Sequence, residues 1–348
     1  MTTMTAFRHV GWQQPPQLQE IPVPEPGPGE VLIKVAGAGL CHSDLHLLEW
    51  PEGAVAFGPP YTLGHENTGW VEQVGPGVEG LEPGDAVAVY GPWGCGRCHA
   101  CRRSEENYCE RAAEIGALGG GLGRDGGMAE YMLIPSARLL VPLEGLDPRD
   151  AAPLTDAALT PYHAIKRALP LLRPGSTAVV IGVGGLGQMA VQILRAISPA
   201  RVVAVDVAPA KLELAREAGA DEAVESSAAE EAIGDLTGGL GAELVLDVVG
   251  ADATLALGAK LARVQGQLTL IGLAGGSFPF NFFSQPYACS LSATYWGSAI
   301  ELMEVLELAR RGAIRPRVER FPLERAAEAV ERLRAGEIAG RAVICPNG

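Results

Sequence analysis

The sequence of 348 residues lacks the features that would place it at a membrane or on a nucleic acid. No apolar run reaches the roughly 18 residues, free of charges and turn formers, that a membrane-spanning helix needs. Residues 1–30 contain proline and glycine clusters but no basic start with a long apolar run behind it, so a secretory signal is not expected. The 41 acidic residues outnumber the 27 basic ones, giving a formal charge of −14, and neither nucleic acid nor an anionic membrane attracts such a protein. We therefore expect a cytoplasmic protein whose partners are small molecules.

The order of apolar runs divides the chain into two parts. Up to about residue 150, short valine-rich runs such as "EVLIKVAGAG" and "DAVAVYG" are cut by proline and glycine, which predicts many short strands in a barrel-like or mixed β domain. From "TAVVIGVGGLGQMAVQILRAI" onward, strand-like runs alternate with helix-like ones, and this alternation predicts a parallel, doubly wound sheet. With 47% apolar residues, the chain has enough material for two cores. After about residue 297, two helices and a closing strand follow.

A glycine-rich turn stands between the strand-like "STAVVI" and a helix-like run. Its residues are Gly182, Val183, Gly184, Gly185, Leu186 and Gly187. In a G-x-G-x-x-G turn the first glycine makes the bend, the second lets the backbone approach a pyrophosphate, and the third lets helix and strand pack closely. Asp206 ends the next strand, where an acid binds the adenosine ribose and repels a 2′-phosphate. This setting favours dinucleotide binding, with NAD rather than NADP, over a purely structural glycine turn.

Seven cysteines are present, and four of them share the segment "CGRCHACRRSEENYC" with the spacing C-x2-C-x2-C-x7-C. In a cytoplasmic chain this density indicates a thiolate-bound metal rather than disulfides. Four thiolates close a tetrahedron around Zn²⁺, so the predicted site is structural. Two alternatives are an iron–sulfur cluster and unliganded thiols, but the fourth spacing is longer than in the ferredoxin run and no proline follows it. The predicted ligands are Cys95, Cys98, Cys101 and Cys109; Cys289 and Cys345 are interpreted as buried apolar residues.

A second metal site is suggested by Cys41, in "GLCHSDLH", and His65, in "TLGHENTGWVEQVGPGV". Both residues lie in the β-rich part, outside the four-cysteine segment. A catalytic zinc site needs three protein ligands and one open position, so a third donor has to come from elsewhere in the chain. Taken alone, His65 would more often be a hydrogen-bonded structural histidine.

The segment "GHENTGWVEQVGPGV" matches the G-H-E-x2-G-x5-G-x2-V signature of the zinc-containing alcohol dehydrogenases of the medium-chain dehydrogenase/reductase family. The resemblance covers essentially the whole chain, since "CHSD", "GGMAEY" and "LTDAALTPYHAI" follow in the family's order. Within the family, the chain is similar to bacterial NAD-dependent secondary alcohol dehydrogenases such as that of Rhodococcus ruber. The resemblance implies an α/β protein with a GroES-like, β-rich catalytic domain (residues 1–157 and 298–348) and a doubly wound, parallel-sheet Rossmann domain that binds NAD (residues 158–297).

The resemblance also implies a set of catalytic-site residues. Cys41, His65 and Asp156 resemble the three ligands of the catalytic zinc. Many relatives have a cysteine at the third position; aspartate preserves the formal charge and makes the site harder. Taken alone, Asp156 would be interpreted as a helix cap. Asp44 resembles the carboxylate that orients the ligating imidazole, and Glu66 an outer carboxylate or transient ligand.

For the reaction, the resemblance implies hydride transfer from an alcohol to NAD and a proton path through Ser43, the nicotinamide ribose and His46. His42 matches a position that touches the pyrophosphate, and it is the alternative end of the path because an apolar residue replaces His46 in the similar bacterial enzymes. The implied substrate pocket suggests a medium-sized alcohol or ketone of little polarity. Its candidates are Phe57, Leu122, Phe282, Tyr295 and Trp296.

Two other functions remain open from the sequence. A polyol or sugar dehydrogenase of the same family would share the zinc and NAD sites but offer polar groups for several hydroxyls. A non-catalytic NAD-binding protein would keep the glycine turn and lack zinc ligands, so the ligand residues disfavour it. By analogy with the family, we expect a homodimer or homotetramer.

Overall fold

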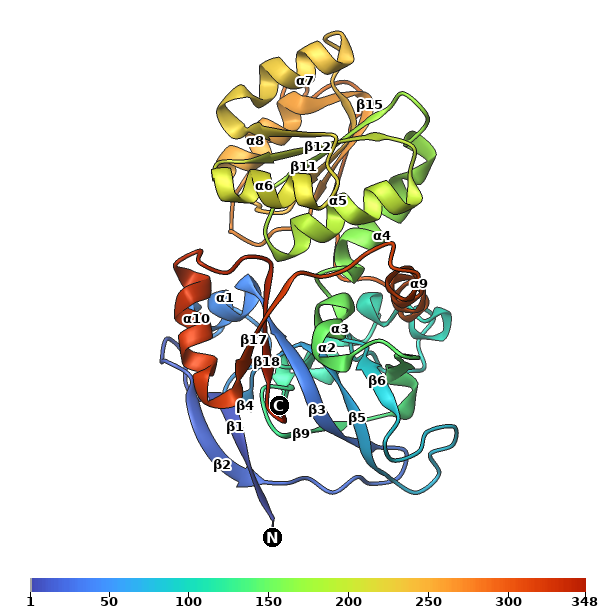
Figure 1. The fold of residues 1–348 in the computed structure, drawn as a ribbon, viewed down its shortest axis with the longest axis vertical. Coiled ribbons are helices and arrows are strands. Elements are labelled where there is room, and N and C mark those ends of the chain that lie inside the picture. Colours follow the sequence, from blue (N-terminus) through green and yellow to red (C-terminus); the bar gives the residue numbers. More distant parts are fainter. Residues whose placement is uncertain (1) are drawn as a thin grey trace. The chain divides into compact units, whose positions relative to one another are not determined.

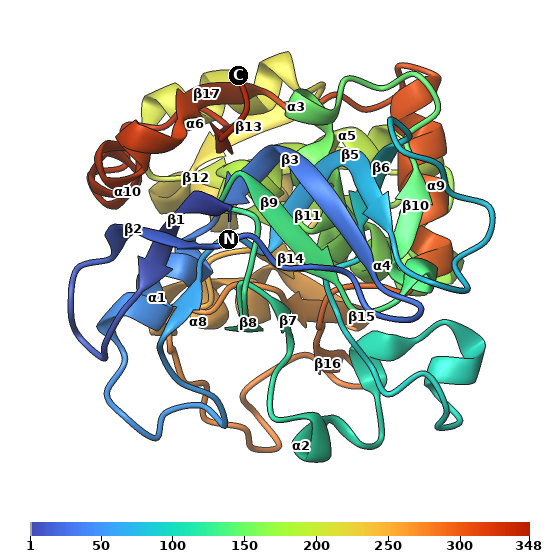
Figure 2. The same cartoon turned by 90° about the horizontal axis from the view of Figure 1, so that it is seen from below.

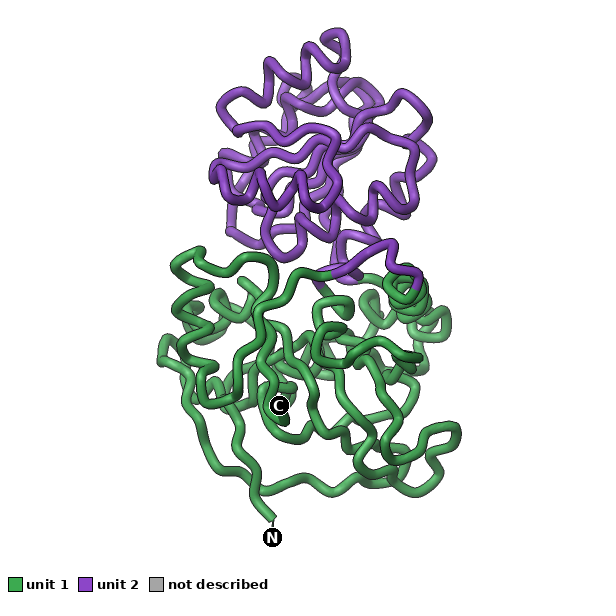
Figure 3. Tube along the Cα trace, in the orientation of Figure 1, with its two compact units in different colours: residues 1–156, 297–310, 316–348 green, residues 157–296, 311–315 purple. Residues whose placement is uncertain are grey.

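The structure is a computed structural model that describes residues 2–348. By the contacts between Cα atoms, the chain divides into two compact units (Figure 3). Unit 1 comprises the chain up to Asp156 together with Gly297–Arg310 and Pro316–Gly348. Unit 2 comprises Ala157–Trp296 and Arg311–Arg315. The C-terminal segment therefore belongs, apart from one short stretch, to the same unit as the N-terminal half.

Unit 1 is built on a seven-stranded sheet in the order β10-β6-β5-β3-β18-β17, with β9 also paired to β3 (Figures 1 and 2). The closing strand of the chain, β18, lies antiparallel beside β3, in the interior of the sheet. A second sheet has the order β2-β1-β4, and β7 pairs with β8. The strands are β1 (Thr3–His9), β2 (Gln17–Pro22), β3 (Val31–Leu40), β4 (Tyr61–Thr62), β5 (Glu66–Val74), β6 (Ala86–Val89), β7 (Gly119–Gly120), β8 (Gly123–Arg124), β9 (Tyr131–Ile134), β10 (Leu140–Pro142), β17 (Val318–Pro322) and β18 (Arg341–Cys345). The helices are α1 (His42–Glu49), α2 (Ala112–Ile115), α3 (Pro148–Ala151), α9 (Ala299–Arg310) and α10 (Ala326–Arg334).

Strand β3 forms the core of unit 1 because its sequence, "VLIKVAGAGL", is apolar on both faces. Every residue of the strand is buried except Lys34, which is half-buried. Gly39, near its end, lies in register with Glu66 on β5 and with Val343 on β18. A Cβ atom at Gly39 would lie 1.9 Å from Oε2 of Glu66. Glycine is therefore needed at this point, since it leaves room for a carboxylate inside the sheet.

Unit 2 contains a six-stranded parallel sheet in the order β13-β12-β11-β14-β15-β16. The order turns at β11 and β14, so the carboxyl ends of these two strands flank the crevice where such sheets bind ligands. The buried faces are rich in valine, leucine and alanine, including Val179, Val203 and Val245. The strands are β11 (Thr177–Ile181), β12 (Arg201–Asp206), β13 (Glu222–Glu225), β14 (Ala242–Asp247), β15 (Ala262–Leu270) and β16 (Ser290–Ala293). The helices are α4 (Leu159–Ala168), α5 (Gly185–Ile197), α6 (Pro209–Glu217), α7 (Ala229–Thr237) and α8 (Asp252–Leu261).

The predicted fold class is confirmed. The first part of the chain is rich in short strands, and the alternating part forms a doubly wound parallel sheet with helices between its strands. Among residues 2–348, no helix combines the length and the apolar character that crossing a bilayer requires.

Candidate active site

The turn before β5 presents His65 to the interior of unit 1. Gly64 has a φ of +96°, a left-handed conformation that glycine adopts without steric cost. The side-chain amide of Asn67 donates a hydrogen bond of 2.9 Å to the carbonyl oxygen of Gly64 and fixes the bend. His65 follows directly and is 2% exposed. The "GHEN" segment thus places an imidazole inside the unit, on a turn that is closed by the hydrogen bond from Asn67 to Gly64.

Asp44 connects the start of α1 to His65. Cys41 is the residue before the helix, and its N–H donates a bond of 2.8 Å to Oδ2 of Asp44. The other carboxylate oxygen, Oδ1, lies 3.2 Å from Nδ1 of His65. Asp44 is completely buried. One carboxylate therefore orients both Cys41 and the imidazole ring of His65. Carboxylates commonly orient metal-ligating histidines through the nitrogen that does not bind the metal.

Cys41, His65 and Asp156 have their donor atoms within 4.8 Å of one another. Asp156 follows the short 3₁₀ helix Ala152–Thr155, and its Oδ2 lies 3.5 Å from Nε2 of His65. The hydroxyl of Ser43 lies 3.4 Å from the same nitrogen. A thiol, an imidazole and a carboxylate thus face a common point, and this donor set suits Zn²⁺ with one position left open.

The charges around His65 determine its proton affinity in the metal-free protein. Burial lowers the pKa of His65, but the negative charge of Asp44 and hydrogen bonds with Asp156, Asp44 and Cys41 raise it, and the net pKa lies well above the ordinary value. A proton and a metal ion would therefore compete for this imidazole, and the anionic groups around it favour either cation.

Glu66 is held by a residue that the sequence did not identify. Arg341, the first residue of β18, bonds both carboxylate oxygens of Glu66: Nε donates to Oε2 at 2.9 Å, and a terminal guanidinium nitrogen donates to Oε1. Both side chains are buried, and burial raises the pKa of Glu66 while the charge of Arg341 lowers it. The only signal in the sequence was one arginine at the head of an otherwise apolar run, "RAVIC".

The two histidines proposed for the proton path lie on α1 in different environments. His42 is exposed. His46 is half-buried and stacks on Trp50, with ring centroids 6.2 Å apart and planes 15° apart. The spacing of four residues puts both on one face of the helix.

The predicted pocket residues differ in their surroundings. In unit 1, Leu122 is buried and Phe57 packs edge-on against Tyr61. In unit 2, Trp296 is 5% exposed and contacts Tyr295 edge-on. The other predicted residue of unit 2 has a different neighbourhood: Phe282 is 73% exposed and contacts Phe283 and Tyr287.

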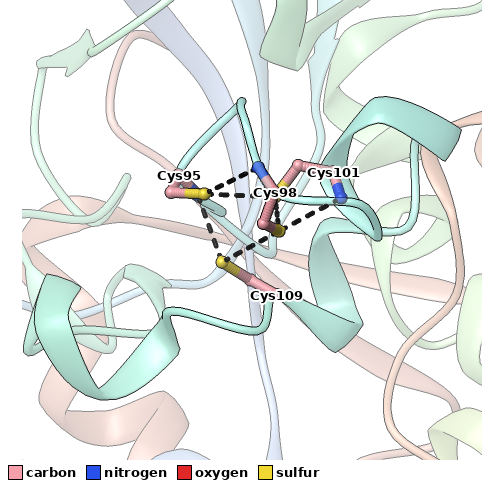
Figure 4. A group of neighbouring side chains, drawn as sticks. All are labelled: Cys95, Cys98, Cys101 and Cys109. Carbon is pink, nitrogen blue, oxygen red and sulfur yellow. Dashed lines mark hydrogen bonds between the residues drawn. The ribbon is translucent and has the colours of Figure 1, made fainter.

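The four clustered cysteines converge in unit 1 (Figure 4). Their Sγ atoms are separated by 3.9 Å (Cys95–Cys101), 3.4 Å (Cys98–Cys101) and 3.9 Å (Cys98–Cys109). A tetrahedron with Zn–S bonds of about 2.3 Å has edges of roughly 3.8 Å, so the arrangement fits zinc. Backbone N–H groups of Cys95, Cys98 and Cys101 point to neighbouring sulfurs, and such bonds, led by that from Arg97, lower the pKa of Cys95 to about 6.

In unit 2, the glycine turn joins β11 to α5, which begins at Gly185. Gly182 has a φ of +91°, and a Cβ at Gly187 would lie 1.9 Å from the carbonyl oxygen of Gly182. At Gly184, by contrast, an added Cβ would meet no atom of residues 2–348 within 4 Å. This glycine therefore faces open space and is not required by packing within the unit. Asp206 accepts bonds from the N–H groups of Val183 (2.8 Å) and Ala208 (3.0 Å), which ties the end of β12 to the glycine turn.

Comparison with known proteins identifies the family. Two family models match: the alcohol dehydrogenase GroES-like domain over residues 27–145 and the zinc-binding dehydrogenase over residues 185–310. An NAD-dependent alcohol dehydrogenase of Sulfurisphaera tokodaii is 36% identical over 99% of this chain and 100% of its own length. A D-arabinose 1-dehydrogenase (NADP(+)) of Saccharolobus solfataricus is 35% identical over 96% of this chain and 95% of its own length. The crystal structure of an alcohol dehydrogenase from Aeropyrum pernix has a TM-score of 0.90 and 37% identity, covering 98% of this chain and 100% of that one. With models matching both of its parts and relatives this similar along nearly its whole length, the chain belongs to the zinc-type medium-chain alcohol dehydrogenase family.

Proposed function

We propose that this protein is an NAD-dependent zinc alcohol dehydrogenase that transfers hydride reversibly between NAD and a medium-sized, mainly secondary alcohol or ketone. The observation that carries the proposal is the convergence of the donor atoms of Cys41, His65 and Asp156 within 4.8 Å of one another. Three protein ligands leave a tetrahedral zinc ion with one open position, whereas the four-cysteine site has none. The first site is therefore proposed as catalytic and the second as structural.

The residues of the catalytic site have distinct roles in this proposal. Zinc, when bound, supplies a Lewis acid that lowers the pKa of a ligated hydroxyl, and NAD is the hydride acceptor. Asp44 holds Nδ1 of His65, so that Nε2 is the nitrogen left to bind the metal. Arg341 balances the charge of Glu66 and bonds both of its oxygens, which favours an outer role for this carboxylate.

The proton path is proposed to start at Ser43, whose hydroxyl lies 3.4 Å from Nε2 of His65. It continues through the nicotinamide ribose to His46 or His42. His46 is half-buried and His42 exposed, so His46 is the better shielded of the two. Replacing each histidine by glutamine separates the alternatives. Only replacement of the residue that relays the proton should lower kcat and change the dependence of kcat on pH.

The dinucleotide site is proposed at Gly182–Gly187, with Asp206 bound to the adenosine ribose. Support comes from the open space at Gly184 and from the position of Asp206 at the end of β12. Each oxygen of Asp206 accepts one backbone bond, and a carboxylate oxygen can accept a second from a ribose hydroxyl. The negative charge opposes a 2′-phosphate, so we propose NAD rather than NADP.

The proposed substrate is a secondary alcohol of little polarity, as in the bacterial subgroup that the sequence resembles. Leu122 and Phe57 offer apolar surface in unit 1. The second candidate, a polyol or sugar, is favoured by one observation: a relative of 35% identity is named D-arabinose 1-dehydrogenase. A structural neighbour at 33% identity is instead an acetophenone reductase of Geotrichum candidum in complex with NAD.

One experiment tests these alternatives together. The purified protein is assayed for zinc and then for NAD reduction with matched primary alcohols, secondary alcohols and polyols. The proposal expects two zinc ions per chain and the highest kcat/KM for a secondary alcohol. Highest activity on polyols would favour the sugar dehydrogenase, and a protein that binds NADH without turning over any alcohol would contradict the enzyme.

We also propose a homodimer or homotetramer in the cytoplasm. Strand β16 lies at the end of its sheet, and all four of its residues are exposed. Four aromatic residues just before it are also more than half exposed: Phe280, Phe282, Phe283 and Tyr287. An open strand edge beside an aromatic patch suits pairing with a second copy. A monomer in light scattering at micromolar concentration would contradict the proposed oligomer.

The seven cysteines form no disulfides, which fits the reducing compartment of the proposed cytoplasmic location.

A further inference from the structure

Asp247 is a buried carboxylate at the crevice of unit 2 that the proposed reaction does not use. It is the last residue of β14 and lies in register with Ile181, the last residue of β11. The glycine turn begins at the next residue, Gly182. Asp247 therefore lies at the carboxyl end of the two strands where the order of the sheet turns, the edge at which such sheets bind ligands.

The carboxylate of Asp247 fixes the turn that follows β14. Oδ1 accepts hydrogen bonds of 2.9 Å from the N–H groups of both Val249 and Gly250. The side chain is 0% exposed, and Oδ2 has no hydrogen-bond partner among residues 2–348. An apolar residue at this position would avoid burying that oxygen, but it would leave the N–H groups of Val249 and Gly250 unpaired. The contribution of Asp247 to the structure is therefore the pair of hydrogen bonds that Oδ1 accepts from the turn.

The turn held by Asp247 packs directly on the glycine turn. A Cβ at Gly182 would lie 2.5 Å from Cγ2 of Val249, so the valine covers the face of this glycine. On its other side, the turn bonds to the loop after β15: the N–H of Ala274 donates to the carbonyl oxygen of Val249 at 3.1 Å, and that of Gly276 to Gly250 at 2.8 Å. The position of Val249 against Gly182 therefore depends on the backbone that Asp247 holds.

We infer that Asp247 is a positioning residue of the dinucleotide site, which sets the width of the crevice beside the glycine turn by holding Val249 in place. The inference rests on the proposed NAD binding at Gly182–Gly187. Asp247→Ala deletes two hydrogen bonds to the backbone and frees the turn, so the Kd for NADH should rise about 10-fold or more. Asp247→Asn keeps a carbonyl oxygen in the position of Oδ1 and should stay within about 3-fold of the wild type.

A matched control lies on the same strand. Glu243, near the opposite end of β14, accepts a bond of 2.8 Å from the N–H of Thr177 and is largely buried. Glu243→Ala thus removes a carboxylate that holds backbone at the amino ends of the strands, which is the end of the sheet opposite the crevice. It should lower the melting temperature but leave the Kd for NADH unchanged. A second variant, Val249→Ala, leaves the carboxylate and its bonds intact and removes only the side chain that covers Gly182.

The zinc-loaded full-length variants are titrated with NADH by its fluorescence, and melting temperatures are measured in parallel. Weaker binding in Asp247→Ala, rescue by asparagine and an unchanged Kd in Glu243→Ala support the inference. Equal Kd shifts in Asp247→Ala and Glu243→Ala, or wild-type binding by Asp247→Ala, overturn it. Should Asp247→Ala not fold, Val249→Ala decides, because wild-type NADH binding by that variant also overturns the inference. A wild-type protein that does not bind NADH overturns the proposed function itself.

Discussion

Replacing Arg341 by methionine removes the cation that is paired with Glu66 inside unit 1. The two side chains are 3% and 0% exposed, so water cannot compensate the carboxylate that remains. Breaking a buried ion pair by removing one partner costs about 3–5 kcal/mol, and we expect the free energy of unfolding to fall by this amount. Burial already raises the pKa of Glu66, and the loss of Arg341 should raise it further. A carboxyl whose pKa is raised by folding binds its proton more tightly in the folded state, so the stability of the variant should fall as pH rises.

The assay is urea unfolding of the zinc-loaded protein at about pH 6 and about pH 8. Arg341→Lys is the conservative control, since it keeps the charge and loses the two-pronged geometry. The double variant Arg341→Met with Glu66→Met removes both charges and should regain most of the lost stability, because replacing a buried pair by apolar residues is often neutral. A loss below about 1 kcal/mol in Arg341→Met, or strictly additive effects in the double variant, would refute the reasoning.

Four further outcomes are expected. Asp156→Ala should abolish turnover while NADH still binds, and wild-type activity with full zinc content would show that Asp156 is not a ligand. Asp206→Ala should narrow the ratio of kcat/KM for NAD over NADP, because it deletes a charge opposed to the 2′-phosphate; an unchanged ratio would argue against the ribose role. Cys109→Ala should release one zinc ion per chain and lower the melting temperature without loss of the catalytic metal, and two zinc ions retained would contradict the four-cysteine site. In the metal-free protein, the raised pKa of His65 contributes stability that is present below its unfolded value of 6.5 and is lost as pH rises through the folded pKa, so the melting temperature after chelation should fall over that range; a flat profile would contradict it.

Features that depend on short segments could be predicted from the sequence. The glycine turn is defined by six consecutive residues between a strand and a helix, and its conformation follows from the absence of side chains at Gly182 and Gly187. The four cysteines lie within one segment, so the chain geometry alone brings them close. In both cases the residues that form the site are neighbours in the sequence, and spacing is enough to relate them.

Features that depend on distant strands could not be predicted. Arg341 is 275 positions from Glu66, and the two meet only because β18 pairs with β3 beside β5. Gly39 is one of two glycines in β3, and only the contact with the carboxylate of Glu66 on β5 shows why a glycine is needed there. Asp247 likewise shows its role only through the backbone of the turn that follows it. Strand register carries this information, and no local pattern encodes it.

The charges around His65 give a physical reason for the closing strand to reach this site. With Cys41 as thiolate and Asp44, Glu66 and Asp156 as carboxylates, four negative charges would surround one imidazole. A bound Zn²⁺ ion supplies two positive charges, and Arg341 supplies a third, so the balance is −1 with Arg341 and −2 without it. Charges interact strongly in a buried site, and the loss of Arg341 would remove the charge that lowers the pKa of Glu66. In the proposed catalytic site, an aspartate or a cysteine as the third ligand gives the same balance, because both are monoanionic. The positive charge of Arg341 on β18 therefore matters for the site in the same way whether the third ligand is an aspartate or a cysteine.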